Sequence, residues 1–167
     1  MTIGHIFCVG DNIDTDQLAP GRYMFGGIET LAAHCLETVR PDFADAVCPG
    51  DLLVAGRNFG AGSSREQAAE ALRHLGIQAV LARSFAGIFY RNAVNLGLPV
   101  LVLPDPEGIE DGDRATLDLE AAHLHLPDKA RTIMLEPIPE NLRMLLGDGG
   151  LVPHLKKRFS AQQGAGQ

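Results

Sequence analysis

Three apolar runs of strand length alternate with two segments of helical periodicity between residues 51 and 103. The apolar runs are Asp51–Ala55, Ile77–Ala82 and Pro99–Leu103, and each has the length of a buried strand. The first helical segment ends before Gly76 and the second before Gly97, because glycine commonly follows the last turn of a helix. Ser84 is expected to cap the start of the second. Strands that alternate with helices form parallel sheets with right-handed crossovers, so this region predicts a βαβαβ unit.

The regions on either side of this unit are richer in short strands. Strands are expected at Ile3–Val9, Thr116–Leu119 and Thr132–Leu135, and a last helix at Pro139–Leu146. The whole pattern predicts an α/β fold with a parallel core and an added antiparallel or barrel-like β segment. We expect a single domain over residues 1–159, because a chain of 167 residues suits one core. The small, polar tail at 160–167 is expected to be disordered.

Composition argues against several classes of function. A net charge of −7 and the lack of a sizeable basic patch argue against nucleic-acid binding. No apolar stretch reaches membrane-spanning length, and the first residues lack the pattern of a secretory signal. Cys8, Cys35 and Cys48 are too widely spaced for a disulfide framework or a zinc site. Their apolar neighbours predict buried thiols, which indicates a reducing, cytoplasmic setting.

The most informative local feature is the glycine-rich segment Asn58–Glu66, which lies between the first apolar run and the first helix. Either Ser63 or Ser64 fits a capping box, because a glutamate or glutamine stands three residues after each. A helix start presents free backbone N–H groups and the positive end of the helix dipole. Arg65 adds a fork suited to a carboxylate or a phosphate. The segment therefore predicts an anion-binding helix start.

Neither standard phosphate loop fits this segment. No lysine precedes Ser63, as a Walker loop requires, and Arg65 stands where the dinucleotide fingerprint has its third glycine. A carboxylate held beside a reactive serine is the better chemical interpretation. The alternative is a plain glycine turn with a capped helix and a surface arginine.

A second polar cluster, Asp11–Gln17, follows the first predicted strand and contains Asp11, Asp14 and Asp16. It lies at the carboxyl end of that strand, where α/β sheets place their ligand sites. A calcium loop is disfavoured because the EF-hand spacing is not met, and simple Asx turns remain the alternative. His123 and His125 share one face of a possible strand but lack a third ligand nearby. No metal site is therefore predicted in this chain.

Four segments taken together resemble one known family. They are Asp11–Gln17, Asn58–Glu66, Ala82–Asn92 and Gly149–Pro153, in this order. In sequence and spacing they are similar to the small subunit of 3-isopropylmalate dehydratase, in the aconitase superfamily. The resemblance covers about Val9 to Phe159, and it implies the fold of the swivelling domain of that superfamily.

The resemblance also implies a reaction and a partner. These enzymes isomerise a malate-type hydroxy acid by removing and re-adding water, here in leucine biosynthesis. A large subunit supplies the cysteine ligands of a [4Fe–4S] cluster, and the small subunit holds no cofactor of its own. By its position in the motif, Ser63 matches the serine that removes the proton from carbon, and Asp16 matches an aspartate that supports the acid–base chemistry. Ser64 and Arg65 match residues that hold the substrate carboxylate, and Gly62 lies beside them.

Two positions depart from the family pattern. Gln67 stands where histidine is usual, and glutamine carries no proton at neutral pH. Phe25 stands where isopropylmalate enzymes usually carry arginine in the loop that reads the substrate, and an aromatic ring there would line an apolar pocket. Small subunits of homoaconitase or of a dimethylmalate-type dehydratase are therefore alternatives. A non-catalytic anion-binding module is the alternative from another class.

Overall fold

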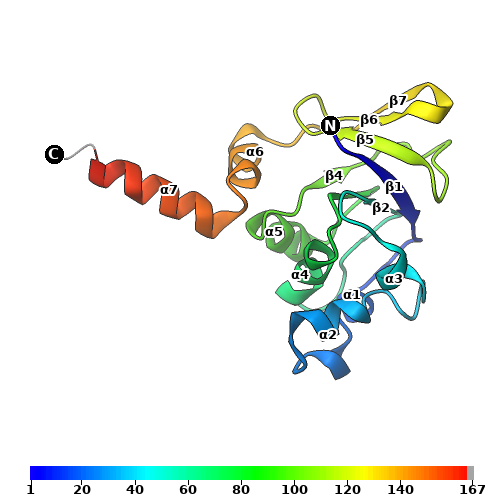
Figure 1. Ribbon diagram of the computed structural model, residues 1–167, viewed down its shortest axis with the longest axis horizontal. Coiled ribbons are helices and arrows are strands. Elements are labelled where there is room, and N and C mark those ends of the chain that lie inside the picture. The colour runs from blue at the N-terminus through cyan, green and yellow to red at the C-terminus, as the bar shows by residue number, and fades with distance from the viewer. Residues whose placement is uncertain (165–167) are drawn as a thin grey trace.

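A seven-stranded mixed sheet organises the computed structural model, which describes residues 1–164 (Figure 1). The strands lie in the order β4-β3-β2-β1-β5-β6-β7. Their bounds are β1 (Ile3–Cys8), β2 (Leu52–Ala55), β3 (Ala79–Ala82), β4 (Val100–Val102), β5 (Arg114–Asp118), β6 (His123–Leu126) and β7 (Arg131–Met134). The predicted α/β class is confirmed.

Strands β1 to β4 are parallel neighbours, and helices lie in the connections between them. Helix α4 (Glu66–His74) joins β2 to β3, and α5 (Gly87–Asn95) joins β3 to β4. The longer connection from β1 to β2 contains α1 (Thr15–Leu18), the 3-10 turn η1 (Gly21–Tyr23), α2 (Gly27–Ala33) and α3 (Phe43–Ala46). Figure 1 shows these helices on one side of the parallel strands. The predicted βαβαβ unit is confirmed.

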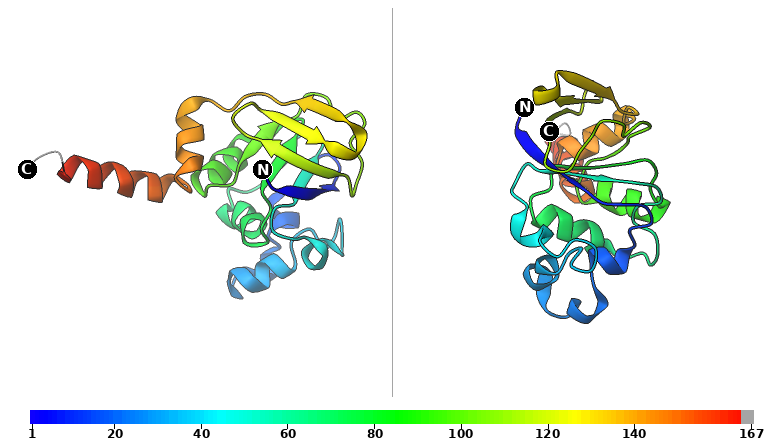
Figure 2. Two further views of the ribbon diagram at one scale, coloured as in Figure 1. Left: turned by 45° about the horizontal axis from the view of Figure 1, so that its top comes forward. Right: turned by 90° about the vertical axis from the view of Figure 1, so that its right-hand side faces the viewer.

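The added β segment is antiparallel, as predicted. Strand β5 pairs antiparallel with β1, and β6 and β7 follow as antiparallel neighbours. A short turn, η2 (Pro127–Lys129), joins β6 to β7. This half of the sheet curls over the face that the helices leave uncovered, which gives the half-barrel outline in Figure 2.

The two faces of the sheet bury separate cores. Side chains such as Phe7 and Leu53 pack under the helices, whereas Ile6 and Leu52 point into the half-barrel. All four residues of β2 and of β3 are buried. A strand covered on both faces reads as a continuous apolar run without alternation, which is the pattern that the sequence shows.

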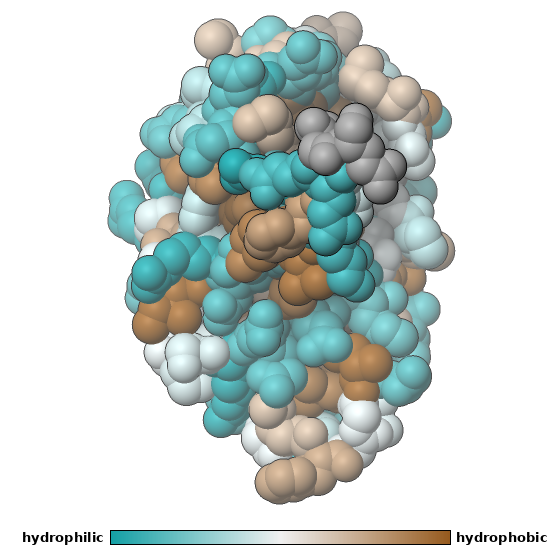
Figure 3. Space-filling view, turned by 90° about the vertical axis from the view of Figure 1, so that its left-hand side faces the viewer, coloured by the Kyte–Doolittle hydropathy of each residue, from teal (hydrophilic) through white to brown (hydrophobic). Residues whose placement is uncertain are grey.

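The C-terminal region differs from its prediction. Helix α6 (Glu140–Gly147) matches the expected last helix, but a further helix, α7 (Leu151–Gly164), follows it and projects from the body (Figure 1). Residues 160–164, expected to be disordered, therefore form the last turn of α7, while 165–167 lie outside the described residues. Helix α7 contributes no buried residue, and Figure 3 views the molecule from the side on which it projects. None of the helices within residues 1–164 has the length and apolarity needed to cross a membrane.

The burial pattern predicts a large difference between two phenylalanines. Phe43 is fully buried and packs edge-on to Phe7 with ring centroids 5.4 Å apart, whereas Phe159 on α7 is 61% exposed. We expect Phe43→Ala to lower the free energy of unfolding by about 3–5 kcal/mol and Phe159→Ala to lower it by less than about 0.5 kcal/mol. Urea unfolding of the full chain measures both. Equal losses would contradict this assignment of the core.

Candidate active site at the carboxyl edge of the parallel strands

The loops that follow β1, β2 and β3 meet at one edge of the sheet and continue its parallel pairing. The backbone N–H of Thr15 donates to the Ala61 carbonyl at 2.8 Å, and that of Gly60 donates to the Ile13 carbonyl at 2.7 Å. On the other side, the Phe59 N–H donates to the Ser84 carbonyl at 3.0 Å. The glycine-rich segment thus lies between the acidic loop and the loop after β3, which brings together the two polar clusters found in the sequence.

Two glycines allow the loops to approach this closely. A Cβ atom on Gly60 would lie 2.2 Å from Cγ of Phe89, a buried residue of α5. A Cβ atom on Gly62 would lie 3.0 Å from the hydroxyl oxygen of Thr15. Both glycines also have positive φ angles, +80° and +107°, which other residues rarely adopt. The glycines are therefore required by local geometry.

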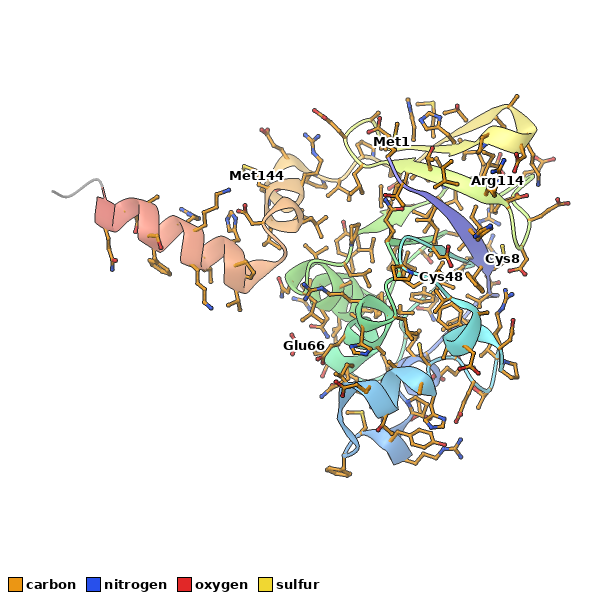
Figure 4. The ribbon with its side chains drawn as sticks, viewed as in Figure 1. Met1, Cys8, Cys48, Glu66, Arg114 and Met144 are labelled. Carbon is orange, nitrogen blue, oxygen red and sulfur yellow. The ribbon has the colours of Figure 1, made fainter. Side chains whose placement is uncertain are left out.

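The two serines of the motif are exposed and do not cap α4, so the predicted capping boxes are wrong. The N-cap residue is Arg65, with φ −65° and ψ 107°, and no side chain bonds the first turn. Helix α4 begins one residue later than the Ser64 box requires and two residues later than the Ser63 box requires. The Ser63 hydroxyl instead lies 3.2 Å from that of Thr15. Glu66, the first residue of α4, is labelled in Figure 4 and lies far from Arg114 of β5. The start of α4 therefore has free backbone N–H groups and serine hydroxyls not engaged in capping.

The predicted cap of α5 is also wrong. The Ser84 hydroxyl accepts a hydrogen bond from the Asn58 N–H at 2.8 Å, and α5 begins after Ala86 without a side-chain cap. This serine ties the loop after β3 to the glycine-rich segment. The Ser84 hydroxyl thus makes a long-range hydrogen bond with Asn58 instead of the local helix cap that its sequence position predicts.

Arg65 and Asp16 form the charged centre of the edge. Nη1 of Arg65 donates to Oδ1 of Asp16 at 2.7 Å and to the Ala19 carbonyl at 3.0 Å. The Arg65 guanidinium, followed by the Gly21 N–H, holds the pKa of the Asp16 carboxyl below its ordinary value. Nε and Nη2 of Arg65 have no hydrogen-bond partner within residues 1–164. The arginine is thus fixed by one nitrogen and offers its other nitrogens to a ligand.

The other acids of the first loop have structural roles. Asp14 forms a reciprocal capping box with Gln17 at the start of α1, and Asp11 accepts a hydrogen bond from the Arg57 N–H at 2.7 Å. The turn alternative therefore holds for Asp11 and Asp14, and only Asp16 faces Arg65. Within residues 1–164, no three metal-ligating side chains come together.

Phe25 lies apart from this centre. It is fully exposed at the end of the loop after η1, and within residues 1–164 no hydrogen bond or ion pair joins it to Ser63 or Arg65. The same loop is anchored by Arg22, which pairs with Glu37, and by Tyr23, whose ring stacks on His34 with centroids 3.6 Å apart. An open hollow of about 290 Å³ separates this anchor from the charged centre and is lined by Asp16, Gln17, Pro20, Gly21, Arg22, Glu37 and Thr38.

The cysteines differ in part from their prediction. Cys35 is buried, but Cys8 is half-buried and Cys48 is exposed, and Figure 4 shows the latter two on separate segments. Burial raises the pKa of the Cys8 thiol to about 11 and raises that of Cys35 further. Neither thiol is ionised near neutral pH, and the three lie too far apart in the fold to ligate one cluster.

Sequence reasoning missed Thr15. It is one of the two buried polar residues among those described, together with Asp51, and its hydroxyl contacts that of Ser63. Its position between Asp14 and Asp16 in a polar loop gave no sign that it would be buried. Only the pairing of the two loops reveals this contact.

The ion pair predicts a change in the titration of Asp16. Because the Arg65 hydrogen bond is the main cause of the low pKa, Arg65→Met should raise the Asp16 pKa towards its ordinary value. The folded pKa is depressed, so any stabilisation from the pair is present above the ordinary carboxyl pKa and is lost as pH falls through the folded value. Carboxyl-carbon NMR measures this shift. Asp128, held low by Arg114, is the control and should not move, whereas an unchanged Asp16 would refute the ion pair.

The chain is similar to known proteins both in sequence and in structure. Residues 23–106 match the model of the aconitase C-terminal domain. The 3-isopropylmalate dehydratase small subunit 1 of Thermotoga maritima is 45% identical over 162 residues, with 96% of this chain and 98% of the relative covered. The homoaconitase small subunit of Methanothermobacter thermautotrophicus is 45% identical over 155 residues, with 92% and 90% covered.

A solved structure has the same fold. The crystal structure of 3-isopropylmalate dehydratase (leuD) from Methanocaldococcus jannaschii matches with a TM-score of 0.93 and 42% identity, and the match covers 98% of each chain. The seven-stranded sheet described above is thus a shared architecture. The chain belongs to the aconitase family and has the length and fold of that family's separate dehydratase small subunits.

Proposed function

We propose that this chain is the small subunit of a hydro-lyase that interconverts 3-isopropylmalate and 2-isopropylmalate by dehydration and rehydration. Curated relatives named as 3-isopropylmalate dehydratase small subunits, at about 45% identity over nearly the whole chain, support the reaction class. The observation that carries the proposal is the juxtaposition of Ser63, a serine free of capping, with Arg65 at the start of α4.

In this proposal Ser63 is the base that takes the proton from the substrate carbon. The C–H bond breaks, the new O–H bond forms on Ser63, and the electron pair moves to make the double bond as hydroxide leaves the adjacent carbon. A serine alkoxide is unfavourable in water, so its surroundings must favour negative charge. The N-terminus of α4 and the Arg65 guanidinium both act in that direction.

Arg65 binds one substrate carboxylate through its unengaged nitrogens, and the adjacent Ser64 hydroxyl completes the contact. Asp16 holds the arginine in place by the 2.7 Å bond to Nη1. A fixed arginine aligns the substrate carbon with Ser63, and such positioning is a large part of catalysis. We assign Gly62 the role of keeping the space beside Ser63 open, since any side chain there would crowd Thr15.

The leaving hydroxide would be stabilised by a Lewis acid. The described residues include no cluster of metal-ligating side chains, and relatives carry the name small subunit. We infer that a large subunit provides the [4Fe–4S] cluster and that the complete site forms between the two subunits. The exposed position of Ser63 at the sheet edge suits such an arrangement.

The substrates of homoaconitase are the second candidate class, because a homoaconitase small subunit is also 45% identical to this chain. The two substrates differ in their variable group, which is apolar in isopropylmalate and carries a third carboxylate in homoaconitase substrates. Phe25 favours isopropylmalate as the substrate. Phe25 is exposed in this chain, but in the complete site that we propose to form against the large subunit it would offer an apolar contact, and a third carboxylate near it would lack a charge partner.

Replacing Ser63 tests the base. In the complex reconstituted with the large subunit, we expect Ser63→Ala to lower kcat by on the order of 10² or more, the scale of acid–base catalysis. Assembly, measured by sedimentation, should be unchanged because the side chain is exposed. Ser160→Ala on α7 is the control and should keep full activity. A near-normal kcat for Ser63→Ala would remove this serine from the chemistry.

Replacing Phe25 tests the substrate class. For the unmodified complex we expect a higher kcat/KM with isopropylmalate than with homocitrate-type or citrate-type acids. Discrimination among alkyl groups should be modest, because one methylene is worth only about 1–3 kcal/mol. Phe25→Arg should reduce the difference in kcat/KM between isopropylmalate and the tricarboxylic acids. Phe25→Leu, which keeps an apolar group, should leave this difference unchanged. A preference of the unmodified complex for the tricarboxylic acids would establish the homoaconitase alternative instead.

A further inference from the structure

Thr15 is a buried residue whose hydroxyl contacts the serine proposed as the base. It is 3% exposed, and its Oγ1 lies 3.2 Å from Oγ of Ser63. No other side-chain hydrogen bond of Thr15 occurs within residues 1–164. A buried hydroxyl almost always keeps a partner, because an unpaired one is unfavourable. Ser63 is that partner here.

The structure holds the Thr15 hydroxyl firmly in this position. The residue opens α1, which begins with the capping box of Asp14 and Gln17. Its backbone N–H is bonded to the Ala61 carbonyl at 2.8 Å, and a β-branched side chain has few rotamers available. Thr15 is thus fixed both by its own helix and by the glycine-rich loop that carries Ser63.

Gly62 provides a second, independent observation. A Cβ atom at this position would lie 3.0 Å from Thr15 Oγ1, closer than nine in ten real contacts of a Cβ atom. A glycine is therefore needed for the Thr15 hydroxyl to reach the next residue, Ser63. The glycine at position 62 thus allows the hydroxyls of Thr15 and Ser63 to come into contact.

We propose that Thr15 is a positioning residue that donates its hydroxyl hydrogen to Ser63 Oγ and stabilises the negative charge on that oxygen when Ser63 acts as base. The inference rests on the proposed role of Ser63. Thr15 keeps its own proton throughout and forms no covalent bond. A hydroxyl that donates to an ionised oxygen makes a shorter and stronger bond than one between two neutral hydroxyls, so the contact strengthens when the serine loses its proton.

The charged groups around Ser63 would remain in place if this donor were removed. Arg65 at the helix start pairs with Asp16 of α1, Asp14 is engaged in the cap of α1, and Glu66 lies in the first turn of α4. Valine has the shape of threonine but no hydroxyl. Thr15→Val therefore deletes the donor with little change in volume or in the surrounding charge.

The test compares Thr15→Val with Thr15→Ser in the reconstituted complex. We expect Thr15→Val to lower kcat by about 10-fold or more, on the scale of a lost hydrogen bond to a charged group, while KM changes less than about 3-fold. The acid limb of the kcat/KM profile, which reports the free base, should move to higher pH. Thr15→Ser restores the hydroxyl. It should recover most of kcat and return the acid limb of the kcat/KM profile to its original pH.

Three outcomes would overturn the proposal. One is a wild-type kcat and pH profile in Thr15→Val. Another is a loss that Thr15→Ser does not rescue, and the third is a loss confined to thermal stability. If Thr15→Val does not assemble, Thr15→Ala against Thr15→Ser gives the same comparison. Ser63→Ala in parallel separates the two hypotheses: an active Ser63→Ala refutes the proposed function, whereas an inactive Ser63→Ala with a normal Thr15→Val refutes only this inference.

Discussion

The backbone pairing between the acidic loop and the glycine-rich loop is the constraint on which the site depends. The bonds from Thr15 to Ala61 and from Gly60 to Ile13 extend the parallel ladder beyond the ends of β1 and β2. They bring Asp16 to Arg65 and Thr15 to Ser63, pairs that are almost fifty residues apart in sequence. Without this pairing each loop would be an ordinary polar turn.

Glycines allow the two loops to pair, and aromatic side chains of the core pack against the glycine-rich loop. Gly60 lies against Phe89, and the buried Phe59 packs edge-on to the same ring with centroids 5.1 Å apart. The loop is therefore seated on the hydrophobic core beneath the helices. Core packing, not loop composition, sets the direction in which Ser63 and Arg65 point.

The sequence predicted the sheet and the motifs well because their signals are local. Buried runs such as Leu52–Ala55 read directly as strands, and glycines mark where helices end. The errors concern interactions between distant segments. Ser84 has the sequence position of a cap, but its hydroxyl bonds Asn58, and Thr15 looked like a loop residue but is buried. Helix α7 escaped prediction because its apolar residues show little helical periodicity and none of its residues is buried.

The loop that carries Phe25 lies outside the paired loops. It is attached by η1, by the Arg22–Glu37 pair, by the stacked rings of Tyr23 and His34, and by Met24, which packs against the core. It meets the charged centre at Gly21, whose N–H donates to Asp16 Oδ1 at 3.1 Å. In the proposed function, the residues for chemistry and the loop for specificity thus have largely different supports, which meet at the bond from Gly21 to Asp16. A substitution of the exposed Phe25 would leave the backbone bonds between the other two loops intact. If the proposed roles hold, substrate preference can therefore change during divergence while Ser63 keeps its position. Relatives named for two different substrates, each about 45% identical to this chain, fit such a division.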